Sequence, residues 1–238
     1  MNRRSFIKII GLTISIFNIR VFGYSTNNNE KISFNHGVAS GDPTSNKIIL
    51  WTKITKASNK SINVSWHVSD KKNFLNIINS GTVKSNSYND FSVKVDAKIP
   101  KKYCGNEIYY RFFVNDKFSI TGTTKTLPIS DPNKFNIAIC SCSNYPAGYF
   151  NAYKEIANDN NIDLVLHLGD YLYEYDKDGY ASEDSEKLNR VVDPPHEIVT
   201  LDDYRKRHAL YKTDKDLQLL HSSKAMVAVW DDHEFTND

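Results

Sequence analysis

The sequence predicts an α+β protein with two domains, an antiparallel β-sandwich followed by an α/β domain. Short segments of alternating apolar and polar residues recur through the first half of the chain, with turn residues between them. The second half instead alternates fully apolar runs with segments of helical periodicity. The pairs Leu127-Pro128 and Asp131-Pro132 separate the two patterns and mark the boundary.

Composition is that of an ordinary globular protein. The chain has 238 residues, of which 40% are hydrophobic and 24% charged, and this length suits one large domain or two smaller ones. The formal net charge of +2 gives no reason to expect specific nucleic-acid recognition. With three cysteines, at least one cannot pair within the chain, and Cys140 and Cys142 are too close along a strand to bond easily to each other.

The first 24 residues predict an export signal. Arg3 and Arg4 are followed by Phe6 and then by an apolar run over residues 9–19, a pattern that resembles a twin-arginine signal. We therefore expect recognition by the twin-arginine export machinery and a periplasmic or secreted location. Residues 21–23 offer no clear cleavage motif, so a cleaved form and an uncleaved, membrane-anchored form both stay open.

Residues 31–128 predict the β-sandwich. Turn residues separate apolar segments with period-two alternation, so the strands are expected to be antiparallel. The predicted strands cover residues 48–51, 62–68, 91–96 and 109–113. Trp51 and Trp66 are expected in the core. Acids, histidines and cysteines do not cluster here, which favours a role as structural support or as a lid.

Residues 135–238 predict alternating strands and helices. Apolar runs mark three buried strands, at residues 135–140, 163–168 and 225–230. A helix is expected from Pro146 to Ala157, because apolar residues recur there at helical spacing and proline suits a first turn. Two more helices are expected after Leu201 and after Asp214, and residues 176–200 are expected to be an irregular loop.

Potential metal ligands follow each of the three predicted strands. If the strands are parallel, their carboxyl ends meet at one edge of the sheet, where ligands bind in open α/β sheets. The carboxylate of Asp170 can bridge two cations, and the phenolate of Tyr173 is a hard ligand suited to ferric iron. A lone histidine after a strand is usually structural, but His233 is flanked by three acids.

In their order along the chain and in their residues, these segments resemble the motifs of the alkaline phosphatase D family of calcineurin-like metallophosphoesterases. The motifs that carry the resemblance are His36–Pro43, Leu50–Thr52, Ser141-Cys142, His167–Glu174, Asp203–Arg205 and Trp230–Glu234. The resemblance implies an N-terminal sandwich of the fibronectin type III or immunoglobulin kind, followed by the first part of a metallophosphoesterase domain.

The resemblance also implies an activity and a site. The activity is hydrolysis of small or polymeric phosphomonoesters and phosphodiesters by metal-activated water, with Fe(3+) and Ca(2+) as cofactors. The implied metal ligands are Cys142, Asp170, Tyr173 and Asp232, with Asn237 as a further ligand. His233 would act as the acid or stabilise the transition state. Asn144 would contact phosphate or cap a helix.

The chain departs from this family at its end. Relatives continue beyond the segment that contains His233, through a further part that carries more Asp and His ligands. His196, His208 and His221 precede the last strand and are not expected to replace them. We therefore expect a truncated chain, whose missing ligands could come from a separately encoded C-terminal part. Two alternatives stay open: an inactive fragment, and a non-catalytic exported binding protein whose working domain is the sandwich.

Overall fold

The computed structural model describes residues 31–236. The predicted export signal at residues 1–24 and the predicted ligand Asn237 lie outside this range. Two β-sheets make up most of the fold, and the helices are few. The larger sheet has six strands, in the order β5 (Ser92–Lys98), β2 (Lys47–Lys53), β1 (Val38–Gly41), β11 (Ala225–Ala228), β10 (Leu164–His167) and β9 (Ile137–Cys140).

The second sheet is antiparallel and faces the first across a shared core. Its strands run in the order β4 (Ile77–Ser85), β3 (Ile62–Ser69), β6 (Ile108–Val114) and β7 (Lys117–Phe118), and β8 (Gly122–Thr124) also pairs with β6. Leu50 of the first sheet and Val64 and Phe112 of the second are completely buried in one hydrophobic cluster. The predicted antiparallel strands are therefore confirmed, whereas the finer likeness to fibronectin type III or immunoglobulin domains stays a prediction.

Two of the strands that sequence alternation did not reveal have plain physical reasons for being missed. Strand β1 is only four residues long and consists largely of small side chains. Strand β4 carries polar residues on both faces, and its Gly81 leaves room for the indole ring of Trp66. A short, small or polar strand gives no hydrophobic period to read.

The larger sheet runs across the predicted boundary between the two parts of the chain. Strand β1 pairs antiparallel with β2 but parallel with β11, with Ser40 opposite Ala225 and Gly41 opposite Met226. A side chain on Gly41 would collide with the Met226 carbonyl, so this pairing depends on glycine. The N-terminal strands and the α/β strands thus share one hydrogen-bonded sheet.

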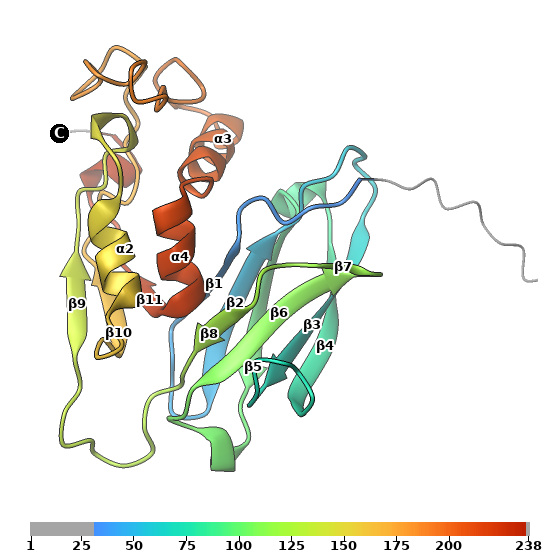
Figure 1. Ribbon diagram of the computed structural model, residues 1–238. Helices are drawn as coiled ribbons and strands as arrows, with labels where there is room; N and C mark the ends of the chain where they lie inside the picture. The colour runs from blue at the N-terminus through green and yellow to red at the C-terminus, as the bar shows by residue number, and fades with distance from the viewer. Residues whose placement is uncertain (1–30, 237–238) are drawn as a thin grey trace, which may run out of the picture. The chain divides into compact units, whose positions relative to one another are not determined.

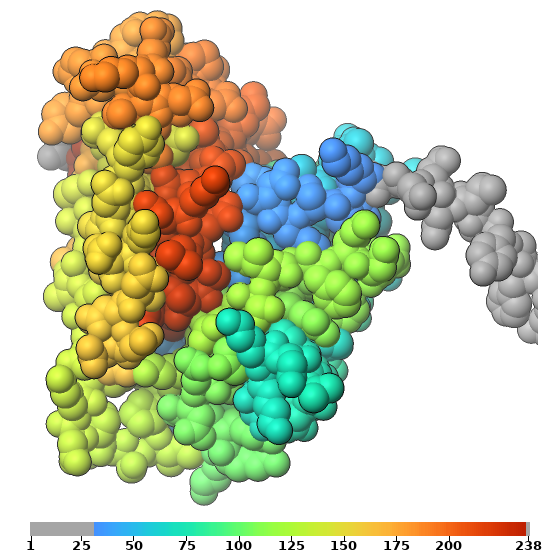
Figure 2. Space-filling view, in the orientation of Figure 1, coloured from blue at the N-terminus to red at the C-terminus, as the bar shows by residue number. Residues whose placement is uncertain are grey.

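Within residues 31–236, three α-helices accompany the parallel strands: α2 (Asn151–Asn158), α3 (Leu201–Tyr211) and α4 (Lys215–Ser223). Helices α2 and α4 pack together and form a second core with β10 and β11 (Figure 1). Helix α4 also contacts β1 and β8. In Figure 2 it lies between these two strands on one side and α2 on the other. Among the described residues, no helix is both long and apolar enough to cross a membrane.

The helix starts agree only partly with expectation. The Asp214 carboxylate accepts hydrogen bonds from the backbone amides of Asp216 and Leu217 and caps α4, as the sequence predicted. Helix α3 begins with a capping box between Thr200 and Asp203. The helix expected from Pro146 is wrong at its start. A short 3-10 turn, Tyr145–Ala147, ends at Gly148, and α2 begins only at Asn151.

The irregular segment at residues 176–200, orange in Figure 2, is held by two buried arginines. The guanidinium of Arg207 is fully buried and donates to the carbonyls of Tyr173, Pro194 and His196. Arg190 donates to the Tyr145 carbonyl and forms a buried ion pair with Asp214, at 2.6 Å. Because Arg207 binds carbonyls of this segment and Arg190 anchors it to residues outside it, the segment has a defined path without regular secondary structure.

Candidate metal centre

Strands β9, β10 and β11 are parallel, so their carboxyl ends meet at one edge of the sheet. Residues 137–140 of β9 pair in register with 164–167 of β10, and 165–167 of β10 pair with 226–228 of β11. The chain beyond these ends carries Cys142, Asp170 and Asp232. Three segments that are far apart in the sequence therefore deliver their side chains to one place.

The turn after β10 places Asp170 in an unusual backbone conformation. Gly169 has φ of 108° and Asp170 has φ of 52°. A Cβ on Gly169 would meet the Asp231 side chain and lie 2.8 Å from the Asp231 amide nitrogen. Only glycine fits both the dihedral angle and the close approach of the turn after β11. Gly169 thus allows the two turns to touch and presents the Asp170 carboxylate between them.

The Asp170 carboxylate lies at the centre of a donor cluster. Its Oδ2 accepts a hydrogen bond from the Cys142 thiol at 3.4 Å and another from the Tyr173 hydroxyl at 3.3 Å. Its Oδ1 is buried without a hydrogen-bond partner. One ligand atom each from Asp170, Asp232 and His233 lie within 4.8 Å of one another. A buried carboxylate oxygen without a partner is costly, and a cation would satisfy it.

The state of Tyr173 agrees with this picture. Burial raises the pKa of its phenol well above the ordinary value, and the neighbouring Asp170 and Cys142 raise it further. Without a cation the phenol is therefore protonated and donates to Asp170. A bound cation would reverse this preference, because metal ions favour the anionic forms of the groups that bind them.

His233 is held by a buried acid that the sequence did not single out as functional. Its Nδ1 donates to Oε2 of Glu174 at 2.9 Å, and Glu174 is only 2% exposed. The ring packs against that of Tyr173 with 4.3 Å between centroids. Burial lowers the pKa of His233. The hydrogen bond to Glu174 and the negative charges of the nearby carboxylates raise it, and together they outweigh burial, so the pKa lies above its ordinary value. The contact fixes the ring and leaves Nε2 as the nitrogen not bound to Glu174.

Asn144 does not cap a helix, and that part of the prediction is wrong. It precedes the 3-10 turn, but its side chain makes no capping hydrogen bond there. Its Nδ2 instead donates to the Tyr180 carbonyl at 2.8 Å, which ties the turn after β9 to the irregular segment. The predicted contact of Asn144 with phosphate stays a prediction.

The four remaining histidines of this half lie outside the cluster. His167 Nε2 pairs with the Tyr153 hydroxyl at 2.8 Å. His221 Nε2 pairs with the Tyr171 hydroxyl at 2.8 Å, and His196 Nε2 pairs with Asp203 at 3.2 Å. His208 belongs to α3. Within residues 31–236, the one carboxylate and histidine group suited to a metal is therefore the group at the strand ends.

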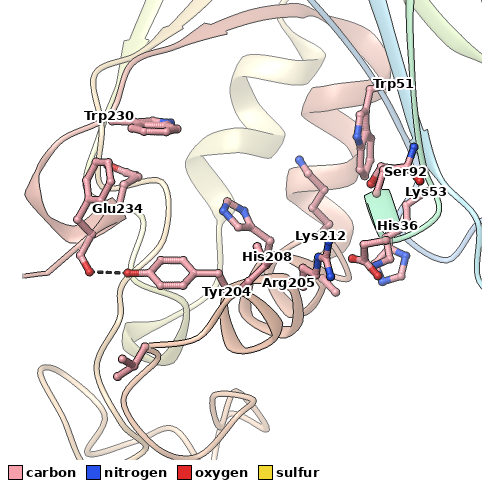
Figure 3. Close-up of a pocket in the computed structure, with 16 residues that line it drawn as sticks. His36, Trp51, Lys53, Ser92, Tyr204, Arg205, His208, Lys212, Trp230 and Glu234 are labelled. Atoms are coloured by element: carbon pink, nitrogen blue, oxygen red, sulfur yellow. Dashed lines mark hydrogen bonds and ion pairs between the residues drawn. The ribbon is translucent and has the colours of Figure 1, made fainter. Parts of the chain in front are cut away.

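Glu234 is a second residue that the sequence left without a role. Its carboxylate accepts from the backbone amides of Asp170, Tyr171 and Asp231. Glu234 also lines a cavity of about 750 Å³, with Trp51, His208 and Trp230 (Figure 3). The sequence did contain one indication that Glu174 and Glu234 matter, because each belongs to a motif that carries the family resemblance. Glu174 lies four residues after Asp170, and Glu234 is next to His233.

A different cavity, of about 420 Å³, adjoins the donor cluster. Its wall includes the candidate ligands Cys142 and Tyr173, together with Asn144, Tyr149 and Tyr180. None of the residues that line it carries a formal charge. The space beside the donor cluster is therefore neutral and partly aromatic.

Comparison with known proteins gives a consistent result. The model of the PhoD-like phosphatase N-terminal domain matches residues 22–128, and that of the PhoD-like phosphatase matches residues 137–238. Alkaline phosphatase D of Bacillus subtilis (strain 168) is 36% identical over the whole chain, which spans 42% of that protein. A solved structure of PhoD superposes with a TM-score of 0.79 at 38% identity, covering 86% of this chain and 40% of that one. The chain thus spans about two fifths of these relatives, and it belongs to the PhoD-like phosphatase family.

Proposed function

We propose that this chain provides the metal-binding edge of a phosphoesterase that hydrolyses phosphomonoesters and phosphodiesters. The carrying observation is the convergence of Asp170, Asp232 and His233 at three parallel strand ends, with Cys142 and Tyr173 hydrogen bonded to Asp170. The sandwich, the working domain of the alternative binding protein, contributes no such group among the described residues. The family supports the reaction class, since its named relative is an alkaline phosphatase.

The donor set supports the proposed pair of ions. Cys142 and Tyr173 would supply a thiolate and a phenolate, which favour ferric iron over magnesium. Calcium prefers oxygen ligands, which Asp170, Asp232 and the predicted ligand Asn237 would offer. When bound, such cations neutralise phosphoryl oxygens and lower the pKa of the attacking water.

The protein's own side chains would orient the ester and handle its proton. His233, held at Nδ1 by Glu174, keeps Nε2 for the leaving oxygen, where a proton would stabilise the departing alkoxide. Asn144 would contact a phosphoryl oxygen. Asp170 and Asp232 would fix the cations relative to His233, so that water and leaving group lie in line.

The neutral cavity beside the cluster suits an uncharged organic group on the ester. We expect Tyr180→Ala to raise KM for bis(p-nitrophenyl) phosphate by about 2- to 10-fold, because it removes an aromatic contact of about 0.5–1.5 kcal/mol. The value of kcat should change little. Tyr88→Ala is the matched control, since Tyr88 is an exposed tyrosine of a separate 3-10 turn. Equal KM values for both variants would refute this placement of the organic group.

Turnover of p-nitrophenyl phosphate and bis(p-nitrophenyl) phosphate tests the proposal as a whole. The expected result is hydrolysis by the chain supplied with Fe(3+) and Ca(2+), loss of hydrolysis with a chelator, and recovery when the ions return. Hydrolysis that the chelator leaves untouched would contradict a metal-dependent mechanism. If the ions bind without turnover, the proposed activity fails for this chain while the metal site stands.

Export and location belong to the same proposal. The supporting observation is the predicted twin-arginine segment at residues 1–24, which would direct the enzyme to the periplasm or the medium. Replacing Arg3 and Arg4 by lysine should retain the protein inside cells, as fractionation would show. Unchanged export of that variant would rule out this route.

A further inference from the structure

The turns that follow β10 and β11, which carry Asp170 and Asp232, have no backbone ladder between them. The last backbone hydrogen bond between β10 and β11 runs from the Val229 amide to the His167 carbonyl, at 3.0 Å. Asp170 and Asp232 both lie beyond it. Some other contact must therefore set the distance between the two carboxylates.

Glu234 makes that contact. One carboxylate oxygen, Oε2, accepts from the Asp170 amide at 3.0 Å and from the Asp231 amide at 2.6 Å. The other, Oε1, accepts from the Tyr171 amide at 2.5 Å. A single side chain thus binds backbone amides of both turns, at the position where Gly169 lets them touch.

The charge of Glu234 matters as well as its shape. Hydrogen bonds to a carboxylate are shorter and stronger than those to a neutral acceptor. All three amides donate, so both oxygens must accept. An amide side chain could offer only one accepting oxygen, and its NH₂ group would face a backbone N–H.

We propose that Glu234 is a positioning residue that clamps the two strand-end turns and so sets the spacing of Asp170 and Asp232. It offers both of its oxygens to backbone amides and is not proposed as a metal ligand. The inference rests on the metal site proposed above. Replacing a residue that positions metal ligands without binding the metal itself typically lowers metal affinity by about 10- to 100-fold.

The first test uses Glu234→Gln in the full chain, titrated with Ca²⁺ alone and with Fe³⁺ as its citrate complex. We expect affinity to fall by about 10- to 100-fold. Thr200→Ala is the control, because it removes a helix cap of α3 and so destabilises the fold away from the strand ends. It should leave affinity unchanged. If both variants lose affinity equally, Glu234 acts through general stability and the proposal is wrong.

The second test needs no metal. Hydrogen exchange in the metal-free chain should be slow at the amides of Asp170 and Tyr171 and faster in Glu234→Gln. Equal exchange in the two proteins would overturn the clamp. This readout separates the inference from the proposed function, since a chain that binds no metal would refute the site while exchange still decides the role of Glu234. If Glu234→Gln does not fold, Glu234→Asp keeps the charge with a shorter reach, and its two turns should exchange faster than those of the native chain.

Discussion

Asp170→Asn should abolish metal binding at the strand ends. Asp170 is the member of the cluster that Cys142 and Tyr173 both contact, and one of its oxygens is buried without a partner. Replacing the carboxylate removes the negative charge that a cation needs. We expect the affinity for Ca²⁺ and Fe³⁺ to fall by more than about 100-fold, the upper limit typical of residues that only hold metal ligands in place. Calorimetric titration would measure it.

The same substitution separates a metal ligand from a structural residue. A buried carboxylate oxygen without a hydrogen-bond partner, as Oδ1 of Asp170 is, destabilises the metal-free fold, so the free energy of unfolding should stay equal or rise in Asp170→Asn. A structural carboxylate would show the reverse, a clear loss of stability with no change in metal affinity. Asp184→Asn is the matched control, because Asp184 is an exposed acid of the irregular segment.

His233→Gln should slow hydrolysis by about 10²- to 10⁴-fold, the range for a positioned acid or base. The physical reason is the contact with Glu174, which fixes the ring and keeps Nε2 for the leaving oxygen. We expect kcat to fall while metal content stays within about twofold of the native chain. Steady-state kinetics and elemental analysis of the same preparations would measure both.

The control for this prediction is His208→Gln. His208 is an exposed histidine of α3 that lies outside the donor cluster, so both readouts should match those of the native chain. If His233→Gln loses metal and activity together, His233 is a ligand, and its proposed role in proton transfer is wrong.

Much of the fold was readable from hydrophobic period alone. The sequence of β3 alternates apolar and polar residues along its whole length, and β10 is a nearly continuous apolar run. The place of the ligands followed from one topological rule, that parallel strands bring their carboxyl ends to one edge. That rule required only the expectation that β9, β10 and β11 are parallel.

What could not be predicted depends on contacts between distant segments. The pairing of β1 with β11 joins two short strands from opposite ends of the chain, and no local pattern announces it. Arg207 reads as a surface residue of a helix, yet it is fully buried because the irregular segment wraps its carbonyls around it. Glu234 reads as part of a motif, and its role emerges only from the amides it accepts.

Elemental analysis after reconstitution tests the central claim, a metal site at three strand ends, most directly. The chain is loaded with iron and calcium, freed of loose ions by gel filtration, and compared with Asp170→Asn. The account predicts that each native chain retains at least about one ion, which a chelator releases, and that the variant retains none. Equal metal content in the two proteins, or no retained metal in the native chain, would contradict it.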